Sequence, residues 1–121
     1  MVADGIIEDD VLVQLCMGVP WGAPDDLNTF MAMVNNVPEN WTFSAFSLGR
    51  NQMPYVAAAI LAGGNVRVGL EDNLWLEKGV LAKNEDLVSR AKEIIEAMGA
   101  KVIGAQDVRK KLNLIKRAPV T

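Results

Sequence analysis

Several residue types and patterns are missing or scarce in this chain of 121 residues, and each absence removes a class of function. Histidine is absent, so a common zinc ligand and the usual proton carrier near neutral pH are missing. Cys16 is the single cysteine, which excludes a disulfide within the chain and favours a reducing, cytoplasmic location. No apolar run approaches the roughly 18 residues of a membrane helix, and the acidic start around Glu8 and Asp9 is unlike a signal peptide.

The overall charge balance also narrows the range of partners. The formal net charge is -3 and the sequence pI is about 4.9, whereas a nucleic-acid-binding surface requires a basic face. Half of the residues are hydrophobic, which is enough for a packed core and too many for disorder. We therefore expect a single domain over residues 1–121 that binds neither nucleic acid nor membrane.

Apolar strand-like runs and helical patterns alternate along the chain. The predicted strands are residues 11–17, 41–48 and 66–70. The predicted helices open at Pro24, with Asp25 and Asp26 in the first turn, at Asn51, and at Asn84, which we expect to cap its helix. A short helix is predicted around 107–112, and the tail over 115–121 is expected to be flexible.

Strands that alternate with helices predict an α/β fold with a parallel sheet. Each βα unit takes only a few tens of residues, a repeat that suits a (βα)8 barrel, but a whole barrel needs around 250 residues. A parallel sheet of three strands would also leave two bare edges. The pattern favours an incomplete barrel, or a compact α/β piece that associates with another chain.

The third predicted strand, within NVRVGLEDN at residues 65–73, carries charges. Alternation along a strand places Val66, Val68 and Leu70 on one face, and Arg67, Gly69 and Glu71 on the other, toward a barrel axis. Gly69 would leave room between the two charges. Glu71 and Asp72 lie at the carboxyl end of the strand, where (βα)8 enzymes keep their active sites. Such acids could divide metal binding and proton transfer between them, or could be a solvated strand end with Arg67 paired to Glu71.

A second candidate site follows the strand predicted at 41–48. Ser47, Gly49 and Arg50 end that strand and open the next helix, a position where barrels often bind phosphate. Arg50 could contact a phosphate or carboxylate of a substrate, or could simply be an exposed arginine near a helix start.

Three segments of the sequence are similar to one enzyme family. They are VLVQLCMGVPWG, SAFSLGRNQMPYVAAAILAGG and GGNVRVGLEDNLWLEKGVLAKNEDLV, collinear over residues 11–114, and they resemble the beta-keto acid cleavage enzymes, including 3-keto-5-aminohexanoate cleavage enzyme. The resemblance implies a zinc-dependent (βα)8 barrel that condenses a beta-keto acid with acetyl-CoA and cleaves it to acetoacetate and an acyl-CoA. It assigns Glu71 as the zinc carboxylate, Asp72 to proton transfer, and Arg67 to stabilising negative charge, provided that the chain turns to bring Asp72 to the site. Arg50 would then bind coenzyme A or substrate.

The chain departs from that family in ways that bear on its activity. The histidine pair that completes the family's zinc site is absent, and Asn65 stands where the family is expected to have histidine. The resemblance covers the last three βα units only. We therefore expect a C-terminal segment, inactive alone, that forms a homo-oligomer or associates with the missing barrel half. The alternatives are a non-catalytic half-barrel that completes a partner chain, and a small α/β binding domain.

Overall fold

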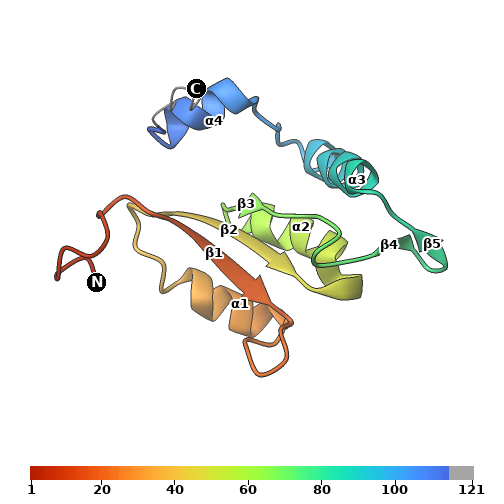
Figure 1. Ribbon diagram of the computed structural model, residues 1–121, viewed down its shortest axis with the longest axis horizontal. Helices are drawn as coiled ribbons and strands as arrows, with labels where there is room; N and C mark the ends of the chain where they lie inside the picture. Colours follow the sequence, from red (N-terminus) through yellow and green to blue (C-terminus); the bar gives the residue numbers. More distant parts are fainter. Residues whose placement is uncertain (115–121) are drawn as a thin grey trace, which may run out of the picture.

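The computed structural model describes residues 1–114, and the flexible tail predicted over 115–121 lies outside them. Three parallel strands, β1 (Leu12–Met17), β2 (Thr42–Ser47) and β3 (Asn65–Val66), lie in the order β1-β2-β3. The helices are α1 (Leu27–Val34), α2 (Gln52–Leu61), α3 (Asn84–Ala97) and α4 (Ala105–Lys111), with a 3-10 turn, η1 (Gly49–Asn51), before α2. The predicted α/β alternation with a parallel sheet is confirmed (Figure 1).

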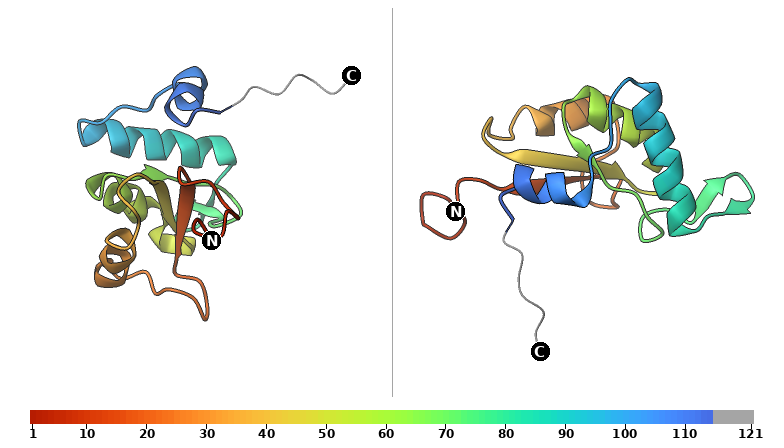
Figure 2. Two further views of the ribbon diagram at one scale, coloured as in Figure 1. Left: turned by 90° about the vertical axis from the view of Figure 1, so that its left-hand side faces the viewer. Right: turned by 90° about the horizontal axis from the view of Figure 1, so that it is seen from above.

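One face of the sheet carries the core. Side chains of β1, β2 and β3 that point to this face pack against α1 and α2, and Figure 2 shows both helices on the same side of the strands. The buried members of this cluster are Leu15, Met17, Phe30, Ala45, Tyr55 and Ala59. α3 packs outside α2, where Ala91 and Ile95 meet Val56. Because α1 and α2 cover this face, its strand residues are apolar, as a buried parallel sheet requires.

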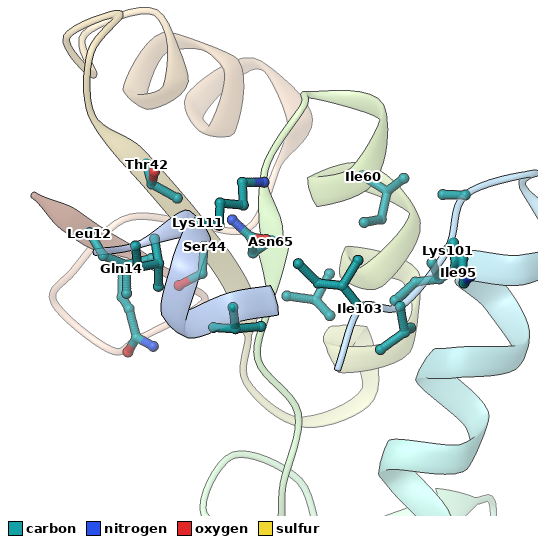
Figure 3. A pocket seen from close by; sticks show the side chains of 15 residues that line it. Leu12, Gln14, Thr42, Ser44, Ile60, Asn65, Ile95, Lys101, Ile103 and Lys111 are labelled. Carbon is teal, nitrogen blue, oxygen red and sulfur yellow. The ribbon is translucent and has the colours of Figure 1, made fainter. Parts of the chain in front are cut away.

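The opposite face of the sheet is more polar and is only partly covered. Gln14, Ser44 and Asn65 line a cavity of about 400 Å³ there (Figure 3). Val108 and Lys111 of α4 also line it, as does Leu112 just after this helix. The Ser44 hydroxyl is buried and finds no hydrogen-bond partner within residues 1–114. Polar strand side chains of this face therefore form one wall of a cavity whose other walls are mostly apolar, and the face does not form a second packed core. In the part of the chain that the structure describes, each helix is too short or too polar to cross a membrane.

One predicted helix start and one predicted helix cap are wrong. α1 begins at Leu27 and not at Pro24, because the Gly18 N–H donates to the Ala23 carbonyl and holds this segment beside β1. Asp26 is the N-cap and accepts from the Thr29 N–H at 2.9 Å. Asn84 does not cap α3: it is the first helical residue, the cap position belongs to Lys83, and the Lys83 N–H donates to Asp86.

The third strand is much shorter than predicted. It ends at Val66, apart from one further sheet hydrogen bond from the Arg67 N–H to the Ala45 carbonyl at 3.3 Å. A turn follows, because the N–H groups of Asp72 and Asn73 both donate to the Gly69 carbonyl, at 3.2 and 3.1 Å. A short antiparallel hairpin that we did not predict comes next, formed by β4 (Trp75–Glu77) and β5 (Val80–Leu81) around Lys78-Gly79.

Gly64 provides a test of this packing. A Cβ built on Gly64 would overlap the ring of Phe43, whereas one built on Gly104 would meet nothing within 4 Å. Phe43 packs against the core, so its ring has little freedom to move. We expect Gly64→Ala to lower the free energy of unfolding by about 1–3 kcal/mol, as overpacking does. Urea denaturation would measure it, with Gly104→Ala as the control; equal midpoints for the two variants would contradict this packing.

Candidate active site at the carboxyl ends of the strands

Arg67 and Asp72 form the centre of the candidate site. The Asp72 side chain is only 4% exposed and accepts from Arg67 Nε at 3.0 Å and from Nη2 at 3.1 Å. The same Nη2 donates to the Glu71 carboxylate at 2.7 Å, and the Glu71 side chain is 83% exposed. Two adjacent acids thus differ sharply in environment: Asp72 is enclosed by Arg67, whereas Glu71 can still reach a ligand from solvent.

The turn at residues 69–73 brings these groups together. On a regular strand Asp72 would point away from Arg67, and the bend at Gly69 reverses that orientation. The predicted arrangement of Arg67, Gly69 and Glu71 along one strand face is therefore wrong in its geometry. The missing side chain of Gly69 leaves room for Asn84 and not for Arg67, because a Cβ there would lie 3.2 Å from Asn84 Oδ1.

The Arg67 guanidinium also contacts two residues that the sequence did not single out. It lies over the ring of Phe46, 4.3 Å from the centroid, and its Nη1 donates to Gln14 Oε1 at 3.3 Å. The hydrogen bond with Asp72 raises the pKa of Arg67, and Glu71 acts in the same direction. The guanidinium is therefore a fixed cation with defined orientation. The register of the strands could have indicated that Gln14 lies near Arg67. Gln14 pairs with Ser44, and Ser44 pairs with Asn65, which is two residues before Arg67.

Three elements outside the turn hold it in place. The Gln52 amide on α2 donates to the Gly69 carbonyl at 3.0 Å, and Asn84 on α3 accepts from the Leu70 N–H at 2.9 Å. The Gly49 N–H in η1 donates to the Asp72 carbonyl at 2.7 Å. Gln52 is almost fully buried, yet no periodicity or motif marked it as a residue that positions the site.

We expect Gln52→Ala to loosen this turn. The Gly69 carbonyl keeps its two local donors but loses the contact that ties it to α2, a loss of about 1 kcal/mol. Amide hydrogen exchange at Asp72 and Asn73 should become about 5-fold to 10-fold faster. Gln106→Ala, at an exposed position on α4, is the matched control; unchanged exchange in Gln52→Ala would show that α2 does not hold the turn.

A second polar cluster lies at the carboxyl ends of β1 and β2. Asp25 accepts hydrogen bonds from the Asn51 amide and from Ser47 Oγ, the latter at 3.0 Å. These bonds, the one from Asn51 first, lower the pKa of Asp25 below its ordinary value of 3.8. Because the folded-state pKa is the lower one, their contribution to stability is present above pH 3.8 and is lost as the pH falls through the folded value. The cluster anchors the loop before α1 to η1.

The structure places Arg50 apart from the Arg67–Asp72 pair. Arg50 is exposed in η1 and lines a cleft with Trp75 and Lys78 of the hairpin. Cys16 lies nearer the pair: burial raises the pKa of its thiol, Asp72 adds to the increase, and Arg67 opposes it. Such a shift disfavours the reactive thiolate.

Metal binding by these residues alone is incomplete. Within residues 1–114, no group of three His, Cys, Asp or Glu side chains could hold a metal ion. Catalytic zinc ordinarily takes three protein ligands. Residues 1–114 therefore do not fit a complete zinc site, and Glu71 is a candidate for one ligand at most.

Comparison with known proteins points to one group of enzymes. A family model described as beta-keto acid cleavage enzyme matches residues 1–114. The chain is 70% identical over 117 residues to 3-dehydrocarnitine:acetyl-CoA trimethylamine transferase of Rhizobium meliloti (strain 1021), an alignment that covers 97% of this chain and 39% of that protein. It is 34% identical over 113 residues to 3-keto-5-aminohexanoate cleavage enzyme of Acetoanaerobium sticklandii, covering 93% of this chain and 41% of that protein.

A further relative is named for a different substrate. The chain is 30% identical over 115 residues to 3,5-dioxohexanoate:acetyl-CoA acetone transferase of Paraburkholderia graminis, an alignment that covers 91% of this chain and 37% of that protein. The chain thus spans about two fifths of the length of the curated relatives that it matches.

Proposed function

The chain belongs to the beta-keto acid cleavage enzyme family, and we propose on this basis that it supplies the last three βα units of a (βα)8 barrel. The complete enzyme would condense a beta-keto acid with acetyl-CoA and release acetoacetate and a new acyl-CoA. Support comes from the parallel sheet and from relatives named as acetyl-CoA transferases. The relative at 70% identity makes 3-dehydrocarnitine the first keto acid to test.

One observation carries the proposal. The buried carboxylate of Asp72 accepts two hydrogen bonds from the guanidinium of Arg67, which follows the carboxyl end of a strand. In the proposed reaction Asp72 accepts a proton from the carbon between the carboxylate and the keto group. Arg67 remains charged and stabilises the negative charge that this step creates on the substrate oxygen. Arg50 would bind a phosphate or carboxylate of the co-substrate.

Glu71 is the one zinc ligand that we propose among residues 1–114. This exposed carboxylate could supply one ligand, and the remaining ligands would have to come from outside residues 1–114. A bound zinc ion would supply Lewis-acid polarisation of the keto group. We expect the isolated chain neither to bind zinc stoichiometrically below 1 μM nor to cleave keto acids. Isothermal titration with zinc, paired with an assay for acetoacetate, checks this; tight binding together with cleavage by the chain alone would contradict it.

Reconstitution tests the activity. The chain would be co-expressed with the portion of the Rhizobium meliloti transferase that the alignment leaves uncovered, and the complex would be assayed for acetoacetate from acetyl-CoA and 3-dehydrocarnitine. We expect product only when both polypeptides are present. A folded complex that yields no acetoacetate from any of a panel of beta-keto acids would overturn the proposal.

A further inference from the structure

A cleft beside the candidate active site contains Arg50. It lies between η1, the start of α2 and the β4–β5 hairpin, has a volume of about 510 Å³, and is lined by Arg50, Met53, Asn73, Trp75, Lys78 and three neighbours in the hairpin. Its walls connect directly to the site, because Asn73 follows Asp72 and the Gly49 N–H, beside Arg50, donates to the Asp72 carbonyl. The cleft therefore adjoins the turn that carries Asp72.

The cleft has the charge pattern of an anion site. Arg50 comes from η1 and Lys78 from the hairpin loop, and neither forms an ion pair with another residue among 1–114. Glu77 is the one acid in the lining, so the two cations outnumber it. Two cations without an ion-pair partner within 4 Å among residues 1–114, on separate elements that line one cleft, can contact two phosphate groups of one ligand.

An aromatic ring adds a second kind of contact. Trp75 is 49% exposed and lines the cleft, so one part of its ring is open to a planar ligand. Its backbone is held at both ends by the buried Asn73 side chain, whose Nδ2 donates to the Trp75 carbonyl at 2.6 Å and whose Oδ1 accepts from the Trp75 N–H at 3.1 Å. Stacking of a base on such a ring contributes about 1–3 kcal/mol. Met53 supplies a polarisable apolar wall beside it.

We infer that this cleft binds the nucleotide end of coenzyme A, with its phosphates on Arg50 and Lys78 and its adenine on Trp75. The inference rests on the proposed function, which supplies acetyl-CoA as co-substrate, and adds where the co-substrate lies. The cleft volume is within the range of about 300–1,000 Å³ for ligand sites, and a single phosphate would leave the Trp75 ring unused. The pantetheine arm would then extend from the cleft toward Asp72.

Isothermal titration calorimetry tests the site by measuring how tightly three probes bind to the chain. They are coenzyme A, adenosine 3′,5′-bisphosphate and pantetheine, which lacks the nucleotide. We expect the first two to bind and pantetheine not to bind. Arg50→Gln and Trp75→Leu should each weaken binding of both nucleotides by about 5-fold to 100-fold, which is the effect of losing 1–3 kcal/mol. Both side chains are exposed, so the fold should survive, as a melting curve would show.

Matched variants away from the cleft show whether the loss of affinity is specific to the cleft or follows from losing any positive charge or any tryptophan. Arg90→Gln on α3 and Trp41→Phe before β2 do not line the cleft and should leave the affinity unchanged. Pantetheine that binds as well as coenzyme A, nucleotides that do not bind, or cleft variants that behave like these controls would each overturn the inference. If the reconstituted enzyme formed acetoacetate with an acetyl-CoA KM unaffected by Arg50→Gln and Trp75→Leu, the cleft and the role of Arg50 would be refuted. The proposed cleavage of a beta-keto acid with acetyl-CoA would still stand.

Discussion

Asp72→Asn is expected to lower the turnover of the reconstituted enzyme by about 10²-fold to 10⁴-fold, the usual contribution of a general base. The amide keeps the size of the carboxylate but cannot accept the proton, and it leaves Arg67 without its main anionic partner. The loss should fall on kcat more than on the KM for acetyl-CoA, because Asp72 acts on the keto acid in the proposed reaction. Initial rates of acetoacetate formation at varied acetyl-CoA would measure both constants.

The same substitution should also cost stability. Breaking a buried ion pair typically costs 3–5 kcal/mol, but the Arg67 side chain is 30% exposed and partly solvated, so we expect about 1–3 kcal/mol. Asp107→Asn, an exposed acid on α4, is the control for both measurements. Turnover within 3-fold of the unmodified enzyme would remove Asp72 from the proton transfer step, whatever the change in stability.

Phe30→Ala is expected to lower the free energy of unfolding by about 3–5 kcal/mol, the typical effect of truncating a buried phenylalanine. Phe30 is the largest fully buried side chain among residues 1–114 and joins α1 to the sheet. Its ring lies edge-on to Tyr55, with centroids 5.4 Å apart and an interplanar angle of 66°, an arrangement that adds its own stabilisation. The substitution removes this contact and leaves a cavity between α1 and α2.

Urea denaturation followed by circular dichroism would measure this loss. Domains of this size are stable by roughly 5–15 kcal/mol, so the expected loss is a large share of the total. Leu61→Ala is the matched control, because Leu61 ends α2 with 81% of its surface exposed and should change stability little. Similar midpoints for the two variants would show that the cluster around Phe30 does not hold the sheet to its helices.

Local patterns were sufficient for most of the fold. Apolar runs predicted β1 and β2 to within a residue at each end, and the helices predicted to open at Asn51 and Asn84 correspond to α2 and α3, which begin within a residue of those positions. The hairpin was missed although Lys78-Gly79 lies between two short apolar runs, since segments of two or three residues carry little periodic signal. The start of α1 was misplaced because Pro24 is a weaker determinant than the hydrogen bond from Gly18 to Ala23.

The candidate site was predicted as a set of residues but not as an arrangement. Arg67, Glu71 and Asp72 meet, and Arg50 lies in a separate cleft nearby. Alternation along an extended strand could not describe this geometry, because the strand ends at Val66 and a turn follows. Their chemical roles stay predictions until the substitutions above are measured.

The amino-acid sequence by itself determined the alternation of strands and helices, the family, and the absence of histidine, since these depend on residue identity and short-range spacing. Only the tertiary structure decided that Asp72 is enclosed by Arg67 and that Glu71 is not. The turn that makes this difference is held by Gln52 and Asn84, which lie 17 and 14 residues from their partners. Contacts over such separations form only when helices and sheet pack together, so no local pattern could have revealed them.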